Sequence, residues 1–321
     1  MSKKLGTDQF IEIAKASARI RSFVAKTPLR LNKSLSTNGT SVYFKMENLN
    51  PTGSFKLRGA ANKILSMSEA ERKKGVVTAS TGNHGAGVGY MCEKTGTKGT
   101  VFGPDTMSQA KYDGMVSYGI DVVKNEGDPI NGEINARKYA ADNQIPFISP
   151  YNDPQIVGGQ GTIGFELFAE VQDLDVVFVS LGGGGLMSGI AISMANLSPK
   201  TKIIAVSPSN SNVMMQSVAA GEVLDLPSEP TLSDGTAGGV EMGTITFEYC
   251  RDYVDEFIEV SEDELVEGLR LFIDDTNTVG EGAVGVAVAG YLQQKEKWSG
   301  KKVAIIACGG NISRSVLKEI L

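Results

Sequence analysis

Residues 47–60 read Glu47-Asn-Leu-Asn-Pro-Thr-Gly-Ser-Phe-Lys-Leu-Arg-Gly-Ala60, and the rest of the chain is interpreted outward from this stretch. It predicts a strand over residues 42–46, a turn over residues 50–53, and a helix over residues 54–67 with Ser54 as its N-cap. Lys56 then lies at a strand–turn–helix junction beside bulky apolar residues. A lysine placed there can lose solvation, lower its pKa and attack a carbonyl group. The alternative is a lysine that extends from an ordinary helix start into solvent.

Short apolar runs alternate with helical segments along most of the chain. This pattern predicts an α/β protein with parallel sheets that are covered by helices on both faces. The expected strands cover residues 42–46, 75–79, 100–102, 120–123, 146–148, 176–180, 202–206 and 302–306. The expected helices cover residues 7–24, 54–67, 83–94, 108–118, 130–143, 161–171, 185–195, 262–276 and 282–293, with another beginning at Val213 and one near the C-terminus.

Composition narrows the class of protein. The 321 residues are 41% hydrophobic and carry a net charge of −6 without a basic block, which argues against nucleic-acid or membrane partners. No apolar run reaches the length of about 18 residues that a membrane span requires. Three widely spaced cysteines and no secretory leader favour a reducing, cytoplasmic location. A single histidine, His84, excludes a multi-histidine metal centre.

Glycines gather in four short clusters that are expected to follow strands: residues 80–85, 158–162, 182–186 and 308–311. The third cluster, Gly182-Gly-Gly-Gly-Leu186, follows an apolar strand and opens a helix, so its backbone N–H groups can cradle a phosphate. A tight turn is the alternative explanation. No Gly-Lys-Ser/Thr follows, so the cluster is not a P-loop, and Met187 breaks the dinucleotide fingerprint. The stretch from Leu224 to Gly243 is the best candidate for a long functional loop.

A phosphate cradle combined with an apolar-flanked lysine suits one cofactor, pyridoxal 5'-phosphate, whose aldehyde needs a lysine. The sequence resembles the β-family (fold type II) pyridoxal-phosphate enzymes, specifically the threonine/serine dehydratase and serine racemase group. The resemblance rests on Pro51-Thr-Gly-Ser-Phe-Lys-Leu-Arg-Gly59, on Gly82-Asn-His-Gly85 and on the glycine cluster at 182–185, and it extends from Thr27 to Asn311. It implies a two-domain architecture like that of the tryptophan synthase β-subunit, and a homodimer.

The resemblance also implies roles for particular residues. Lys56 would form the Schiff base and act as the catalytic amine, and Phe55 would pack beside the cofactor ring. Asn83 would bond the ring's phenolic oxygen, and Glu281 matches an acid near the active site. The backbone amides of five consecutive residues would hold the phosphate: Gly182, Gly183, Gly184, Gly185 and Leu186.

Ser80, Thr81, Asn83 and His84 would form the loop that grips the substrate carboxylate. Thr81 stands where racemases of this group carry a serine, so it is a candidate catalytic residue whose added methyl group disfavours racemisation. Racemase-like members also bind a cation after the 202–206 strand, but Ser207 and Val213 replace the acids there, which predicts no metal at that position.

Cys308 falls where the family places a neutral residue against the pyridine nitrogen; a buried small residue after a strand is the alternative. A neutral thiol does not keep that nitrogen protonated, so charge at Cα is better relieved by expelling a β-substituent. Elimination is therefore expected: the Lys56 amine takes the Cα proton, the β-hydroxyl leaves, and hydrolysis yields a 2-oxo acid and ammonia.

The expected substrate is a small amino acid, L-threonine, L-serine or a related β-hydroxy amino acid. Tyr151, Asn152 and Glu241 are expected near it and would favour a larger or substituted one, although Glu241 could be a solvated loop acid. An amino-acid racemase is one alternative, and a non-catalytic phosphate- or nucleotide-binding protein is another. A large cofactor domain is expected over residues 1–74 and 152–321, and a small mobile domain over 75–151, so that closure can exclude water.

Overall fold

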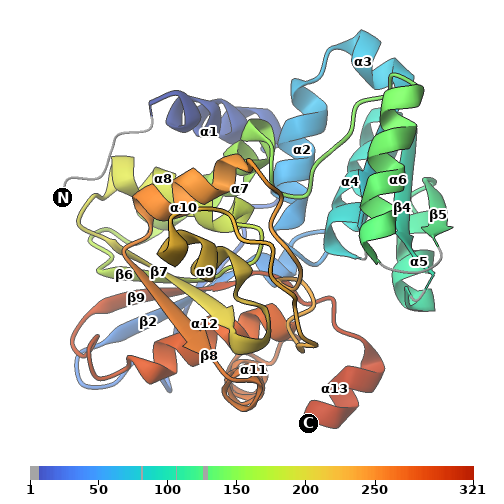
Figure 1. The fold of residues 1–321 in the computed structure, drawn as a ribbon. Helices are drawn as coiled ribbons and strands as arrows, with labels where there is room; N and C mark the ends of the chain where they lie inside the picture. Colours follow the sequence, from blue (N-terminus) through green and yellow to red (C-terminus); the bar gives the residue numbers. More distant parts are fainter. Residues whose placement is uncertain (1–6, 81, 106, 126–128) are drawn as a thin grey trace.

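The computed structural model describes residues 7–80, 82–105, 107–125 and 129–321, which form two sheets with helices around them (Figure 1). The larger sheet has six strands in the order β1-β2-β9-β6-β7-β8. Its strands are β1 (Leu29–Asn32), β2 (Ser41–Met46), β6 (Val176–Ser180), β7 (Lys202–Pro208), β8 (Glu256–Val260) and β9 (Lys302–Ala307). All neighbouring pairs are parallel except β1 with β2 at one edge.

The smaller sheet contains three parallel strands in sequence order, β3 (Val76–Ala79), β4 (Gly99–Pro104) and β5 (Asp121–Asn125). Val76 and Val77 are both buried, yet they belong to different apolar clusters, because successive side chains of a strand point to opposite faces. Apolar residues in unbroken runs therefore suit a sheet that is covered on both sides. The predicted α/β class with parallel, doubly covered sheets is confirmed.

Thirteen α-helices occur among the described residues. The first seven are α1 (Thr7–Ile20), α2 (Lys56–Ser66), α3 (Glu69–Lys74), α4 (Asn83–Thr95), α5 (Gln109–Val116), α6 (Pro129–Asp142) and α7 (Pro154–Glu170). The others are α8 (Gly185–Leu197), α9 (Val213–Ala220), α10 (Ile245–Tyr253), α11 (Glu262–Thr276), α12 (Gly282–Gln293) and α13 (Arg314–Ile320). In the part of the chain that the structure describes, none of these helices has both the length and the hydrophobicity to cross a membrane.

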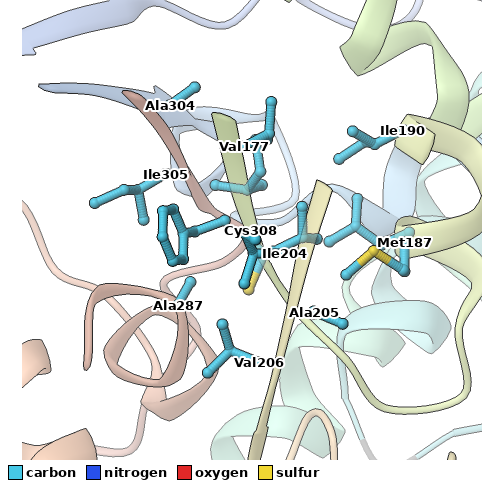
Figure 2. Close-up of a cluster of buried hydrophobic side chains, with 14 of the residues drawn as sticks. Val177, Met187, Ile190, Ile204, Ala205, Val206, Ala287, Ala304, Ile305 and Cys308 are labelled. Carbon is cyan, nitrogen blue, oxygen red and sulfur yellow. The ribbon is translucent and has the colours of Figure 1, made fainter. Parts of the chain in front are cut away.

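The main core lies on both faces of the larger sheet. Helices α7, α8 and α10 lie on one side of it and α11 and α12 on the other, while α2 stands between the two sheets (Figure 1). Figure 2 shows part of this core, with side chains from adjacent strands and flanking helices that include Val177, Ile204, Ile305, Met187, Ala287 and Cys308. Cys308, which directly follows β9, thus lies in the buried core at the end of that strand.

The glycine cluster at 158–162 was expected at a strand end, but it lies inside helix α7. Its glycines serve helix packing: a Cβ at Gly159 would lie 2.3 Å from the Arg58 carbonyl oxygen of α2. A Cβ at Gly189 of α8 would likewise lie 2.5 Å from the backbone nitrogen of Gly161. These glycines let three helices approach closely, so the prediction that this cluster follows a strand is wrong.

Other local predictions also differ from the structure. The expected strand at 146–148 is a single bridge between Phe147 and Val77. Helix α1 ends at Ile20 rather than at residue 24, and β1, β8, α3 and α10 were not expected. The N-cap of α2 is Phe55 rather than Ser54, which pairs with Gly309 in an antiparallel bridge instead. The backbone contact between Ser54 and the distant Gly309 is thus formed in place of the local N-cap that the sequence predicts.

Buried charges fix the first turns of α2. The Arg58 guanidinium is buried and donates to Glu47 from Nε at 2.7 Å and from Nη2 at 2.8 Å. Its Nη1 also bonds Glu166 of α7 at 2.6 Å. Because removing one partner would leave a buried charge uncompensated, this cluster holds α2 firmly between β2 and α7.

Candidate active site

Lys56 is the first residue of α2, and its junction is tied to the turn that follows β9. The Phe55 backbone N–H donates to the Cys308 carbonyl oxygen at 2.9 Å, and the Gly310 N–H donates to the Gly53 carbonyl oxygen at 2.9 Å. Strands β2 and β9 are parallel neighbours, so their carboxyl ends meet at one edge of the sheet. In open α/β sheets ligands bind at this edge.

The Lys56 side chain is partly buried. Its Nζ donates to the Pro150 carbonyl oxygen at 3.0 Å and lies 5.3 Å from the centroid of the Phe55 ring. Burial lowers the pKa of Lys56 from 10.5 to about 8, although the nearby Glu281 and Cys308 raise it. More of this amine is therefore unprotonated near neutral pH than in an ordinary lysine, and a nucleophile or base must be unprotonated.

The glycine cluster at 182–186 joins β6 to α8, as predicted from the sequence. Gly184 is the N-cap of α8 with φ +84°, a left-handed conformation that favours glycine. A Cβ at Gly183 would lie 2.6 Å from the ring of Tyr151, and one at Gly182 would lie 2.8 Å from the Thr236 backbone. N–H groups in the first turn of a helix have no acceptor within that helix. The N–H groups of this loop, which is packed closely against Tyr151 and Thr236, can therefore bind an anionic group.

Asn83 and Glu281 meet across the two sheets. Asn83 Nδ2 donates to both carboxylate oxygens of Glu281, at 2.9 Å each. Asn311 completes the network, because its Nδ2 donates to Asn83 Oδ1 at 2.7 Å and its N–H donates to Glu281 at 3.3 Å. Burial raises the pKa of Glu281, while the hydrogen bonds from Asn83 lower it. The loop at the start of α4 is thus fastened to the N-cap residue of α12.

The Cys308 thiol is buried beside the end of β6. The Ser180 hydroxyl donates to its sulfur at 3.6 Å. Burial raises the pKa of Cys308 well above the usual range of a thiol, and Glu281 adds to this effect. The Cys308 thiol is therefore neutral.

The predicted substrate loop begins at Ser80, whose Oγ accepts from the N–H groups of Gly82 at 3.1 Å and Gly85 at 2.9 Å. Thr81 lies outside the described residues, so its predicted catalytic role has no structural account. His84 is buried, and its Nε2 lies 3.2 Å from the Ile148 carbonyl oxygen. Burial and, to a smaller extent, the nearby Lys56 lower the pKa of His84 to about 3, so the ring is neutral.

The structure also brings Tyr151, Asn152 and Glu241 together. The Glu241 N–H donates to Tyr151 Oη at 2.8 Å, and Asn152 Nδ2 donates to the Glu241 carboxylate at 2.9 Å. Burial raises the pKa of Tyr151 to about 12. Glu241 also pairs with Arg137 at 2.9 Å, so it is an engaged acid rather than a freely solvated one.

These residues fit pyridoxal phosphate. The site offers an amine with a lowered pKa, a close-walled loop of N–H groups and a neutral thiol at the carboxyl ends of adjacent strands. In addition, the buried Ser54 hydroxyl, two residues before Lys56, has no hydrogen-bond partner among the described residues. Such an orphaned group indicates that a polar ligand belongs nearby.

Sequence reasoning missed several residues of this site. Asn311 was noted only as the end of a glycine cluster, yet its side chain bridges Asn83 and the Thr52 carbonyl oxygen. Its place after a strand, in the same glycine cluster as Cys308, was the one available signal. The Pro150 carbonyl oxygen carries no signal in the sequence, because any residue supplies such an acceptor.

Comparison with known proteins agrees with this geometry. The family model described as "Pyridoxal-phosphate dependent enzyme" matches residues 20–309. The chain is 37% identical to an L-threonine ammonia-lyase of Thermotoga maritima, covering 97% of this chain and 77% of the relative. It is 35% identical to an L-threo-3-hydroxyaspartate ammonia-lyase of Saccharomyces cerevisiae, covering 94% of this chain and 92% of the relative.

A solved structure shares the fold. The processed form of threonine deaminase isoform 2 from Solanum lycopersicum superposes with a TM-score of 0.94 at 31% sequence identity, covering 99% of this chain and 94% of the other. The family model spans most of the sequence, and the lysine junction and the glycine loop each follow a strand of the larger sheet. This chain therefore belongs to the family of pyridoxal-phosphate dependent enzymes.

Proposed function

We propose that this enzyme is an ammonia-lyase that removes water from L-threonine, L-serine or a related β-hydroxy amino acid and releases a 2-oxo acid and ammonia. The observation that carries the proposal is the position of Lys56. The pKa of its amine is lowered to about 8. The neighbouring residue, Phe55, donates its backbone N–H to the carbonyl oxygen of Cys308, whose thiol is neutral. Relatives with lyase names over nearly the full chain support the same reaction class.

Pyridoxal phosphate supplies an electron-withdrawing ring that stabilises negative charge at the Cα atom of a bound amino acid. In the proposed reaction Lys56 Nζ holds the cofactor at rest and takes the Cα proton once the substrate has displaced it. This second role requires an unprotonated amine, which burial of Lys56 favours.

The remaining residues are assigned to binding. The N–H groups of residues 182–186 would hold the phosphate, Phe55 would pack beside the ring, and Asn83 would bond the ring's oxygen. Cys308 is assigned to the ring nitrogen, where a neutral thiol favours loss of the β-hydroxyl over transamination. Glu281 orients Asn83 through the two hydrogen bonds of 2.9 Å.

Ser80, Thr81 and His84 are assigned to the substrate carboxylate, and Tyr151 and Glu241 to the substrate side chain. Residues 75–151, which contain the smaller sheet, would form a domain that closes over the substrate. The larger domain would comprise residues 1–74 and 152–321. A homodimer and a cytoplasmic location complete the proposal.

An absorption spectrum tests this function directly. Wild-type protein loaded with pyridoxal phosphate should show the visible band of the lysine-bound cofactor, and it should form 2-oxobutanoate from L-threonine. Lys56→Ala should lose both. Lys63→Ala is the matched control, because Lys63 lies on the same helix but pairs with Asp153 at 2.6 Å; it should retain both.

The substrate panel should include L-serine and L-threo-3-hydroxyaspartate, with chiral analysis of the remaining amino acid. A visible band without any 2-oxo acid from the three substrates would refute the lyase assignment. Inversion of the α-carbon faster than elimination would replace it with a racemase.

A further inference from the structure

The segment between α9 and α10, residues 222–244, crosses the candidate active site; we call it the strap. It contains no helix or strand. A Cβ at Gly235 would lie 3.6 Å from Glu281 Oε1, and Thr236 lies against the Gly182 backbone. Further along, the Glu241 N–H bonds Tyr151 Oη at 2.8 Å. The strap therefore lies against both the glycine loop and the Asn83–Glu281 network.

The strap is rooted in the part of the molecule that contains the larger sheet. The Leu232 N–H donates to the Glu262 carboxylate at 2.9 Å, at the start of α11. The Gly238 N–H donates to Ser211 Oγ, between β7 and α9, at 3.1 Å. Movement of the small sheet alone would leave these contacts in place.

Two acids of the strap pair with cations from the other side of the site. Asp234 accepts from Lys111 Nζ of α5 at 2.7 Å, and Glu241 accepts from Arg137 Nη2 of α6 at 2.9 Å. Both helices pack on the smaller sheet. The strap is thus joined to the small sheet at two points, on two different helices.

Each cation has a further neighbour besides the acid of the strap. The Lys111 ammonium lies 3.6 Å from where a Cβ of Gly82 would be, at the start of the predicted substrate loop. The Arg137 guanidinium stacks on Phe147, 4.4 Å from the ring centroid, and is also held by Glu133 of its own helix at 2.8 Å. The Arg137 guanidinium is therefore also oriented by contacts outside the strap.

We propose that Lys111 and Arg137 are positioning residues that hold the strap closed over the substrate through Asp234 and Glu241. This inference rests on the proposed function, because a closed strap matters for a reaction that must exclude water. All four side chains remain partly exposed, between 27% and 60%. Partly exposed pairs each shift an equilibrium only about two- to five-fold, which suits a clasp that opens in every catalytic cycle.

Hydrogen exchange of the strap tests whether the Lys111–Asp234 and Arg137–Glu241 pairs, together called the clasp, hold the strap in place. This test does not rely on enzyme activity. The protein loaded with pyridoxal phosphate is compared with Lys111→Ala, Arg137→Ala and the double variant, and amide exchange is followed in peptides covering residues 222–244. We expect each single variant to speed strap exchange about two- to five-fold, and the double variant to speed it by about the product of the two effects. Peptides covering β6 should not change.

Swapping the two charges of the Lys111–Asp234 pair, together with a control variant nearby, distinguishes loss of the ion pair from general destabilisation of the protein. Lys111→Asp should speed strap exchange, and adding Asp234→Lys should restore slow exchange. Lys138→Ala is the matched control on α6, because Lys138 pairs with Asp142 of its own helix at 2.6 Å; its strap should exchange like the wild type. The inference would be overturned if hydrogen exchange of the strap were unchanged in the double alanine variant. It would also be overturned if Asp234→Lys did not restore slow hydrogen exchange to Lys111→Asp.

Kinetics show whether the clasp serves the reaction. With whichever substrate the wild type converts, Lys111→Ala and Arg137→Ala should raise KM more than they lower kcat, with an unchanged visible band. Lys138→Ala should match the wild type. An enzyme without lyase activity would refute the proposed function, while the exchange experiment would still decide whether the two ion pairs hold the strap.

Discussion

Asn83 donates to both carboxylate oxygens of Glu281 at 2.9 Å each, and this pair joins residues that are 198 positions apart in the chain. The contact fastens the start of α4, beside the small sheet, to the first turn of α12, beside the large one. Because Glu281 also lies close to Lys56, the same carboxylate influences the charge of the Lys56 amine.

Glu281→Gln should therefore have two effects. The half-buried Asn83 amide would face an uncharged amide group instead of a carboxylate, and a hydrogen bond to a charged group contributes about 1.5–3 kcal/mol. The pKa of Lys56 should fall further, because the negative charge that raises it is gone. Urea denaturation and the pH dependence of cofactor binding measure the two effects. The exposed Glu69→Gln, which breaks a surface pair with Lys73, should change neither.

Cofactor binding by the cofactor-free wild type should depend on pH through Lys56. With a pKa of about 8 the amine is about 10% neutral at pH 7, against about 0.03% for a lysine of pKa 10.5. The rate of binding should rise with pH and level off above about pH 8. Stopped-flow absorbance between pH 6 and 10 checks this expectation. A rate that still rises steeply at pH 10 would mean that Lys56 is an ordinary, solvated lysine.

His84 should remain neutral throughout the physiological range. Its Nε2 faces a carbonyl oxygen, which can only accept, so Nε2 carries the proton and Nδ1 does not. Since this is the single histidine of the chain, its ring nitrogens give unambiguous NMR signals, and these should not titrate between pH 5 and 8.

The same residue sets a limit on stability in acid. The pKa of His84 is depressed in the folded protein to about 3 from an ordinary value of 6.5, so the unfolded chain binds the proton first. The stability that this difference contributes is fully present above about pH 6.5 and is lost as the pH falls toward 3. His84→Gln should flatten this part of the stability profile, measured by urea denaturation at several pH values.

Gly183→Ala should weaken binding of pyridoxal phosphate. The new methyl group would lie 2.6 Å from the Tyr151 ring, and overpacking of this kind typically costs about 1–3 kcal/mol. The dissociation constant, measured by fluorescence titration, should rise about five-fold or more. Gly114→Ala is the control, because a Cβ there meets no atom within 4 Å. Equal affinity of the two variants for pyridoxal phosphate would mean that the glycine loop accommodates the added methyl group without any loss of binding free energy.

Features with a local cause could be read from the sequence. The bounds of α12, residues 282–293, agree with the prediction, because a run of small apolar residues follows Glu281 without a helix breaker. The junction at Gly182–Leu186 was also predicted, because an apolar strand precedes these glycines and a helical pattern follows them. Ser54 shows the limit of this reasoning. Serine is a common N-cap residue, but the backbone of Ser54 instead forms an antiparallel bridge with Gly309, which is distant in the sequence.

The sequence was therefore enough to establish the α/β pattern, the lysine junction, the glycine loop and the family they resemble, because each depends on residues within a few positions of one another. The fold alone determined which distant groups meet. Asn311 reaches Asn83 across 228 positions, Lys111 reaches Asp234 across 123, and the glycines of α7 pack against helices rather than a ligand. Such pairings depend on how the sheets and helices pack, and charged or amide side chains on separate elements carry no local signal of their partners.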